Sequence, residues 1–140
     1  MRKLPFAKKK KLRKISSLWN EAKAAFNKHI RERDVPGFHP FDGKTNTCVT
    51  CKERLPMKKL NAGHFFHGKC WMSAMDERNV WPQCITCNKY KHGNLIEYSE
   101  FLRDLYGDEI IDILRELRHI PWKPKRQNLL DIIKKYSEAL

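Results

Sequence analysis

The sequence has no long apolar run, and it has few acidic residues for its length. No stretch approaches the roughly 20 apolar residues that a membrane-spanning helix needs, and the N-terminus carries no apolar signal region. The 140 residues include 16 acids against 29 lysines and arginines, which gives a formal net charge of +13. These features predict a cytoplasmic chain that does not bind membranes and whose partner is a polyanion, with nucleic acid as the first candidate.

Much of the excess charge lies in the first 14 residues, which contain no acid. We expect residues 1–14 to form a flexible basic arm that contacts DNA phosphates without reading base sequence. The contacts predicted in this arm are Lys8, Lys9, Lys10, Lys11, Arg13 and Lys14. A solvated tail, or a tail that binds anionic lipid, is the alternative interpretation.

Cysteine is scarce and its number is odd, which suits a disulfide framework poorly. Four of the 5 cysteines form two Cys-x-x-Cys pairs, Cys48/Cys51 and Cys84/Cys87. Paired thiols in a reducing compartment favour a metal, and two such pairs can complete one closed tetrahedral zinc site. The pattern therefore predicts a structural zinc ion, with Cys70 left as a free thiol. Two coincidental pairs of buried thiols are the alternative.

Three side chains near these pairs suit phosphodiester chemistry. The imidazole of His64 titrates near neutrality and can act as a general base toward water. Asn88 directly follows Cys87, and its amide oxygen is a hard donor suited to Mg²⁺ or Mn²⁺. Asn79 could hydrogen-bond across the intervening loop and hold the backbone at His64. For each of the three, an ordinary structural or surface role is the alternative.

Further basic residues lie close to this constellation. Arg78, Lys89 and Lys91 are predicted to contact DNA phosphates, with ordinary basic surface as the alternative.

The middle of the chain is expected to be a small β unit followed by a helix. Strands are predicted at 57–65 and 79–82, the second stopped by Pro82, with a long surface loop at 66–78 between them. A helix is expected to begin near Cys84 and to end before Gly93.

Helices are predicted on both sides of this unit. Ser16 or Ser17 is the expected N-cap of a helix that runs to about Asp34. Three more helices follow, at 95–106, at 108–117 with Asp108 as its cap, and at 126–140. The apolar stripe of the last helix fits either a core face or a dimer seam. We expect a nuclease-like domain at 15–120 and a C-terminal helix at 121–140 that could serve dimerisation.

Several segments closely resemble the lambdoid phage NinG (Rap) recombination protein family, which is regarded as a family of branched-DNA endonucleases. The resemblance covers roughly residues 16–118. Its clearest segments are 62–65, 76–80, 83–88 and 93–95. More broadly, the pattern is similar to the HNH, or His-Me finger (ββα-metal), nucleases. An asparagine directly after the last zinc cysteine also resembles phage endonuclease VII, which resolves four-way junctions.

The resemblance implies an α+β fold with a zinc-stapled ββα-metal core, flanked by N- and C-terminal helices. It implies that His64 is the catalytic histidine, Asn79 the central asparagine and Asn88 a ligand of the catalytic cation. Many HNH enzymes carry an acidic ligand directly before the histidine, where this chain has Gly63. The second ligand would then be Asn61, His67 or a DNA phosphate.

The function implied by the resemblance is metal-dependent cleavage of branched recombination intermediates, such as Holliday junctions and D-loops, in phage recombination. Cutting two strands of a junction needs two active sites, so a homodimer is expected. One alternative is a zinc-ribbon protein that binds DNA as a recombination mediator without cutting it. Another is a general HNH nuclease that nicks duplex DNA.

Overall fold

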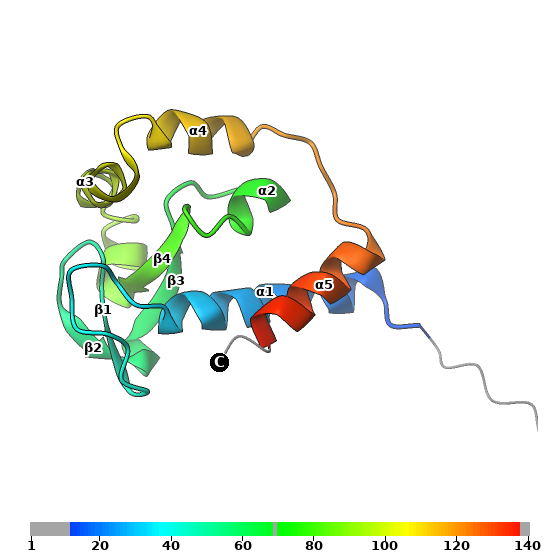
Figure 1. Ribbon diagram of the computed structural model, residues 1–140, viewed down its shortest axis with the longest axis horizontal. Helices are drawn as coiled ribbons and strands as arrows, with labels where there is room; N and C mark the ends of the chain where they lie inside the picture. Colours follow the sequence, from blue (N-terminus) through cyan, green and yellow to red (C-terminus); the bar gives the residue numbers. More distant parts are fainter. Residues whose placement is uncertain (1–11, 69, 138–140) are drawn as a thin grey trace, which may run out of the picture.

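A computed structural model of the chain describes residues 12–68 and 70–137 as a mixture of helices and two small sheets (Figure 1). The elements are α1 (Ile15–Glu32), β1 (Thr45–Thr47), β2 (Arg54–Pro56), η1 (Met57–Lys59), β3 (Leu60–His64), α2 (Trp71–Ala74), β4 (Val80–Cys84), η2 (Thr86–Tyr90), α3 (Leu95–Tyr106), α4 (Ile110–Leu117) and α5 (Arg126–Ser137). The predicted α+β class is confirmed. Within the described ranges, no helix is long and apolar enough to cross a membrane.

Helix α1 presents one apolar stripe, because its buried residues recur every four positions. They are Leu18, Ala22, Phe26 and Ile30. The predicted serine cap is wrong: the helix begins at Ile15, Lys14 occupies the cap position, and no side chain caps it. The Leu18 N–H already bonds to the Lys14 carbonyl, so the first turn forms without a serine side chain.

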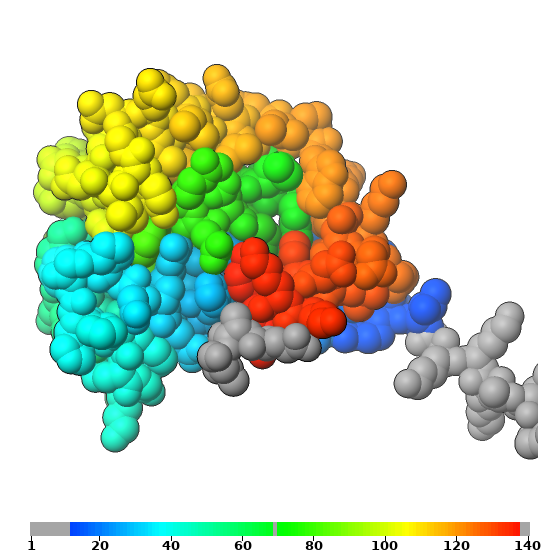
Figure 2. All heavy atoms as spheres, viewed as in Figure 1, coloured from blue at the N-terminus to red at the C-terminus, as the bar shows by residue number. Residues whose placement is uncertain are grey.

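Helix α5 packs lengthwise against α1, as Figures 1 and 2 show, and its Tyr136 ring lies 5.1 Å from that of Phe26, centroid to centroid. Leu129 is fully buried in a cluster with Leu18, Ala22 and Trp71, and Ile133 packs against the same cluster. The apolar stripe of α5 therefore forms core within the chain, which is one of the two alternatives that the sequence left open. Residues 138–140, the predicted end of this helix, lie outside the described part.

Strands β3 and β4 form an antiparallel hairpin in which Leu60 lies opposite Cys84 and His64 opposite Val80. The expectation that Pro82 stops the second strand is wrong, because β4 continues through it to Cys84. The Phe65 N–H bonds to the Asn79 carbonyl, and hydrogen-bonded pairs alternate along an antiparallel ladder. Pro82 therefore falls at a position where the ladder needs no N–H. Strand β3 also starts later than predicted, at Leu60, because residues 57–59 form the short helix η1.

The segment between these strands is not the plain surface loop that was predicted. It contains α2, in which Trp71 and Ser73 are buried. The Trp71 ring lies 4.4 Å from that of Trp19 on α1, centroid to centroid. One helical turn is too short to produce a periodic pattern in the sequence, and its contacts come from elements distant in the chain.

Helices α3 and α4 cover the other face of the hairpin from α1. Trp81 of β4 packs edge-on against Phe101 of α3, in a cluster that also contains Leu102 and Leu114. Val80, the preceding residue on the strand, packs on the α1 side instead. The bounds of α3 match the prediction, whereas α4 begins at Ile110 with Glu109, rather than Asp108, at its cap.

Candidate zinc centre and nucleic-acid site

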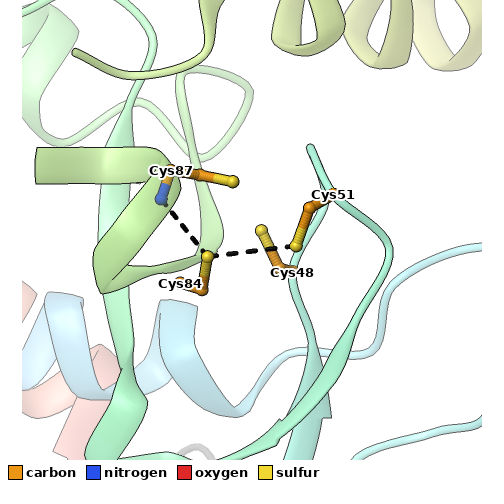
Figure 3. Close-up of side chains that lie close together, drawn as sticks. All are labelled: Cys48, Cys51, Cys84 and Cys87. Carbon is orange, nitrogen blue, oxygen red and sulfur yellow. Dashed lines mark hydrogen bonds between the residues drawn. The ribbon is translucent and has the colours of Figure 1, made fainter. Parts of the chain in front are cut away.

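The four paired cysteines converge on one point. Their sulfur atoms all lie within 4.8 Å of one another, and the Sγ atoms of Cys51 and Cys84 are 3.9 Å apart. A tetrahedral zinc ion with Zn–S bonds of about 2.3 Å would set its sulfur ligands roughly 3.8 Å apart. Figure 3 shows the sulfurs of the two pairs pointing toward one another. The cluster could therefore hold one zinc ion, as the spacing predicted.

Each pair belongs to a tight turn. Cys48 and Cys51 lie in the turn between β1 and β2, where the Cys48 N–H bonds to the Glu53 carbonyl and closes the turn. Lys52 completes it with a left-handed backbone (φ 66°). Cys84 ends β4, and the Cys87 N–H points at its sulfur from 3.3 Å. Helix η2 is shorter than predicted, because its residues form a single wide π-helical turn.

The thiols differ in pKa because burial raises it while hydrogen bonds lower it to different extents. Burial raises the pKa of Cys84 to about 11. It also raises the pKa of Cys51, and the charge of Cys48 adds to that effect. At Cys48 burial acts in the same direction, but hydrogen bonds from the Cys51 backbone and the Thr50 hydroxyl outweigh it and lower the pKa to about 7. Ligation of zinc would therefore expel protons from Cys51 and Cys84.

Polar side chains around the sulfurs were not predicted from the sequence. Asn94 directs its side-chain amide at the Cys87 sulfur from 3.7 Å, and the Thr50 hydroxyl lies 3.3 Å from the Cys48 sulfur. The Gln83 Nε2 atom donates to Thr50 Oγ1 (3.2 Å) and to the Gly93 carbonyl (2.6 Å). Asn94 follows Gly93 and has a left-handed backbone (φ 47°). That glycine was the one sequence feature that could have indicated a turn at this point.

His64 ends β3 and is partly buried beside α2. Its Nε2 atom lies 3.1 Å from the carbonyl oxygen of Ala74. Because a carbonyl only accepts, Nε2 carries the proton and Nδ1 of the neutral ring is unprotonated. Burial, and to a lesser extent the charge of His67, lowers the pKa of His64 below its usual value of 6.5, whereas the backbones of Ala74 and Ala62 act in the opposite direction. The ring is therefore neutral at pH 7 and able to accept a proton.

Asn79 is fully buried and ties together the segment that follows His64. Its Oδ1 accepts from the Phe66 N–H (2.9 Å), and its Nδ2 donates to the carbonyls of Phe66 (3.1 Å) and Ser73 (2.9 Å). Ser73 directly precedes Ala74, whose carbonyl contacts the His64 ring. Asn79 thus fixes both chain segments that flank the imidazole.

The predicted cation ligands are spread over the hairpin and η2. Asn88 lies on η2, and its Oδ1 is buried with no hydrogen-bond partner among the described residues. A buried acceptor without a partner is costly, so this oxygen fits a bound cation. Asn61 and His64 are separated by three positions on β3, and strand alternation directs them to opposite faces. The His67 ring is exposed and lies 6.4 Å from that of His64, centroid to centroid.

Gly63 is closely covered by another side chain. A Cβ at this position would lie 2.3 Å from Gln83 Oε1 and 2.6 Å from Gln83 Cβ. Gln83 from the neighbouring strand therefore fills the space at Gly63, the position that was predicted to correspond to the acidic ligand of HNH enzymes. The Tyr98 hydroxyl, 2.5 Å from the Gly63 carbonyl, holds the same residue from α3.

The predicted phosphate contacts have unequal surroundings. Arg78 is paired with Asp76 at 2.7 Å, which raises the pKa of Arg78 and neutralises its charge locally. Arg13 is paired with Glu21. Lys14, Lys89 and Lys91 are exposed. Lys8, Lys9, Lys10 and Lys11 lie outside the described residues.

Comparison with known proteins gives one consistent result. The family described as Bacteriophage Lambda NinG protein matches residues 2–140. The chain is 34% identical over 110 residues to Protein ninG of Escherichia phage 933W, covering 74% of this chain and 50% of that protein. It is 33% identical over 110 residues to the ninG proteins of Salmonella phage P22 and Escherichia phage lambda, covering 74% of this chain and 49% of each. The chain thus spans about half the length of these relatives. No solved structure matches it significantly.

Proposed function

This chain belongs to the bacteriophage lambda NinG family, and from that membership we propose that it is a metal-dependent, structure-selective endonuclease for branched DNA. Its substrates would be recombination intermediates such as Holliday junctions and D-loops. We assign the β3–β4–η2 unit to the HNH, or His-Me finger, type of nuclease. The supporting features are its two antiparallel strands, the helical turn that follows them, and the thiol cluster beside it.

The observation that carries this proposal is the state of the His64 imidazole. Its Nε2 proton is engaged by the Ala74 carbonyl, which leaves Nδ1 of a neutral ring to take a proton from water. The water oxygen then bonds to phosphorus, and the ester bond to the leaving oxygen breaks. The proton remains on His64 until it is returned to solvent or to the leaving group.

Two amides complete the site. Asn79 acts through the backbone, because its three hydrogen bonds hold the segment that orients the imidazole. Asn88 would hold a Mg²⁺ or Mn²⁺ ion. When bound, such an ion would polarise the scissile phosphate and stabilise the leaving oxygen. The four thiols would hold a structural zinc ion, and a homodimer would bring two such sites to one junction.

A second candidate function is DNA binding without cleavage, as a zinc-ribbon recombination mediator. The observation in its favour is Gly63, where Gln83 fills the place of an acidic cation ligand. A site that relies on Asn88 and a DNA phosphate would bind Mg²⁺ weakly without DNA. The mediator uses the same cysteines and the same positive charge but leaves His64 without a catalytic role.

Cleavage of labelled DNA separates these functions. Wild type, His64→Ala and the surface control His119→Ala are incubated with a four-way junction, a D-loop and linear duplex, in Mg²⁺ and in EDTA. We expect wild type and His119→Ala to cut the branched DNAs preferentially in Mg²⁺, and His64→Ala to be at least about 10²-fold slower because it lacks the base. Equal cutting by His64→Ala contradicts the assignment. Equal cutting of duplex indicates a general nicking nuclease, and binding without cutting indicates a mediator.

A further inference from the structure

A groove of about 530 Å³ lies between the C-terminal part of α1 and the segment that joins β2 to β3. Figure 1 shows this end of α1 close to that segment, although the two are far apart in the sequence. Lys28 and Arg31 line the groove from α1, Lys58 lines it from η1, and Asn61 of β3 contributes an amide. None of the three cations was among the DNA contacts predicted from the sequence.

The groove is positively charged. Among the described residues, Glu32 is the one acid that lines it, and its carboxylate lies 3.8 Å from the Lys28 ammonium, a distance that gives only weak pairing. Lys28 and Lys58 are exposed, and Arg31 is half-buried. These three cations outnumber the acid and leave the walls with an excess of positive charge. Because they come from two separate elements, the fold rather than a local run of lysines brings them together.

These side chains have the chemistry of a phosphate-binding surface. An arginine fork can bind two phosphate oxygens at once, lysines act as point charges, and an amide N–H can donate to a third oxygen. Asn61 lies three residues before His64 on the same strand, or about 10 Å along it at 3.4 Å per residue. A nucleic-acid backbone in this groove would therefore run beside β3, on the face of the strand opposite to the imidazole.

We propose that this groove binds the phosphate backbone of one duplex arm, through Lys28, Arg31 and Lys58. The identity of the ligand rests on the proposed function, whereas the place of binding rests on the groove itself. The groove adds sequence-independent affinity to that of the basic arm and sets the direction in which an arm leaves the site.

The test measures binding without cleavage. A fluorescein-labelled blunt duplex is titrated in EDTA between 50 and 200 mM KCl, and anisotropy gives Kd at each salt concentration. The variant is Lys28→Gln/Arg31→Gln/Lys58→Gln. Three lost phosphate contacts should reduce the slope of log Kd against log salt by about 2.7, at about 0.9 per contact. A matched control, Lys123→Gln/Lys134→Gln/Arg103→Gln, removes the same charge from exposed positions outside the groove and should leave the slope near that of wild type.

Thermal unfolding verifies that the triple variant is folded. If it is not, the single variant Lys58→Gln, at an exposed position, should still reduce the slope by about 0.9. An unchanged slope in the folded triple variant overturns the proposal, as does an equal reduction in the control. If the triple variant loses binding to polyglutamate but binds DNA as wild type does, the groove is assigned to an acidic protein. That result also overturns the proposal. If wild type binds duplex through the groove but never cuts junctions, the proposed nuclease function is wrong and the proposed binding site stands.

Discussion

The two ends of the β3–β4 hairpin are held by different means. At the Leu60–Cys84 end, four thiols gather within 4.8 Å, and the backbone closes into two tight turns around them. At the His64–Val80 end, a single buried amide, that of Asn79, makes three hydrogen bonds to the adjoining segments. The first end could be held by a metal ion bound to the four thiols, whereas the second is held by ordinary polar contacts. Stability and catalysis should therefore respond to different mutations.

The largest effect is expected at the thiol end. Cys84→Ser removes one of the four predicted zinc ligands, and structural zinc contributes an apparent 10–16 kcal/mol in zinc-finger peptides. We expect this variant to lose both its zinc, measured by atomic absorption, and its cooperative thermal unfolding, measured by circular dichroism. Cys70→Ser is the matched control, because that thiol lies outside the cluster and contacts the carbonyls of Leu117 and Ile120. If Cys84→Ser holds no zinc and still melts like wild type, zinc does not hold the thiol end of the hairpin.

A smaller effect is expected at the imidazole end. Asn79→Ala leaves the Phe66 N–H and two carbonyls without their partner, at a cost of about 1–3 kcal/mol for each group that stays buried and unsatisfied. We expect zinc content to be unchanged, the urea midpoint to fall, and kcat for junction cleavage to drop more than KM rises. Asn79→Asp keeps the acceptor to Phe66 and should retain more activity than the alanine variant. Loss of zinc from Asn79→Ala would show that the two ends are not separable.

The smallest effect is a dependence on pH. Burial lowers the pKa of His64 in the native state, so the unfolded chain binds a proton that the native protein does not. Stability therefore falls as pH decreases from about 6.5 through the lowered pKa, by at most about 1.4 kcal/mol for each pH unit that separates the unfolded and native pKa values. The acid limb of kcat/KM should likewise lie below pH 6.5.

Urea unfolding of wild type and His64→Asn at several pH values isolates the contribution of His64 to stability, because loss of zinc would affect both proteins. An acid limb above pH 6.5 would contradict a buried neutral imidazole.

Features with a local cause could be predicted from the sequence. The Cys-x-x-Cys spacing predicted the thiol cluster, because a turn that presents two sulfurs is set by residues next to each other. The bounds of α3 followed from its apolar period and from Gly107, which ends it with a positive φ of 96°.

Features that depend on distant residues could not be predicted. Asn79 was expected to reach across the loop, but its partners Phe66 and Ser73 depend on how that loop folds. Helix α2 exists because Trp71 packs on α1, and no local periodicity indicates it. The same holds for the close contact of Gln83 with Gly63, which joins two strands across their ladder.

The pairing of α1 with α5 has a consequence for how the protein is made. Roughly ninety residues separate the two helices, so at 5–20 residues per second the ribosome needs on the order of ten seconds to deliver the second after the first. Until then Leu18 and Ala22 lack the Leu129 side chain that completes their cluster. The nascent chain therefore exposes an apolar strip that a chaperone can bind, and native folding finishes only after α5 has left the exit tunnel.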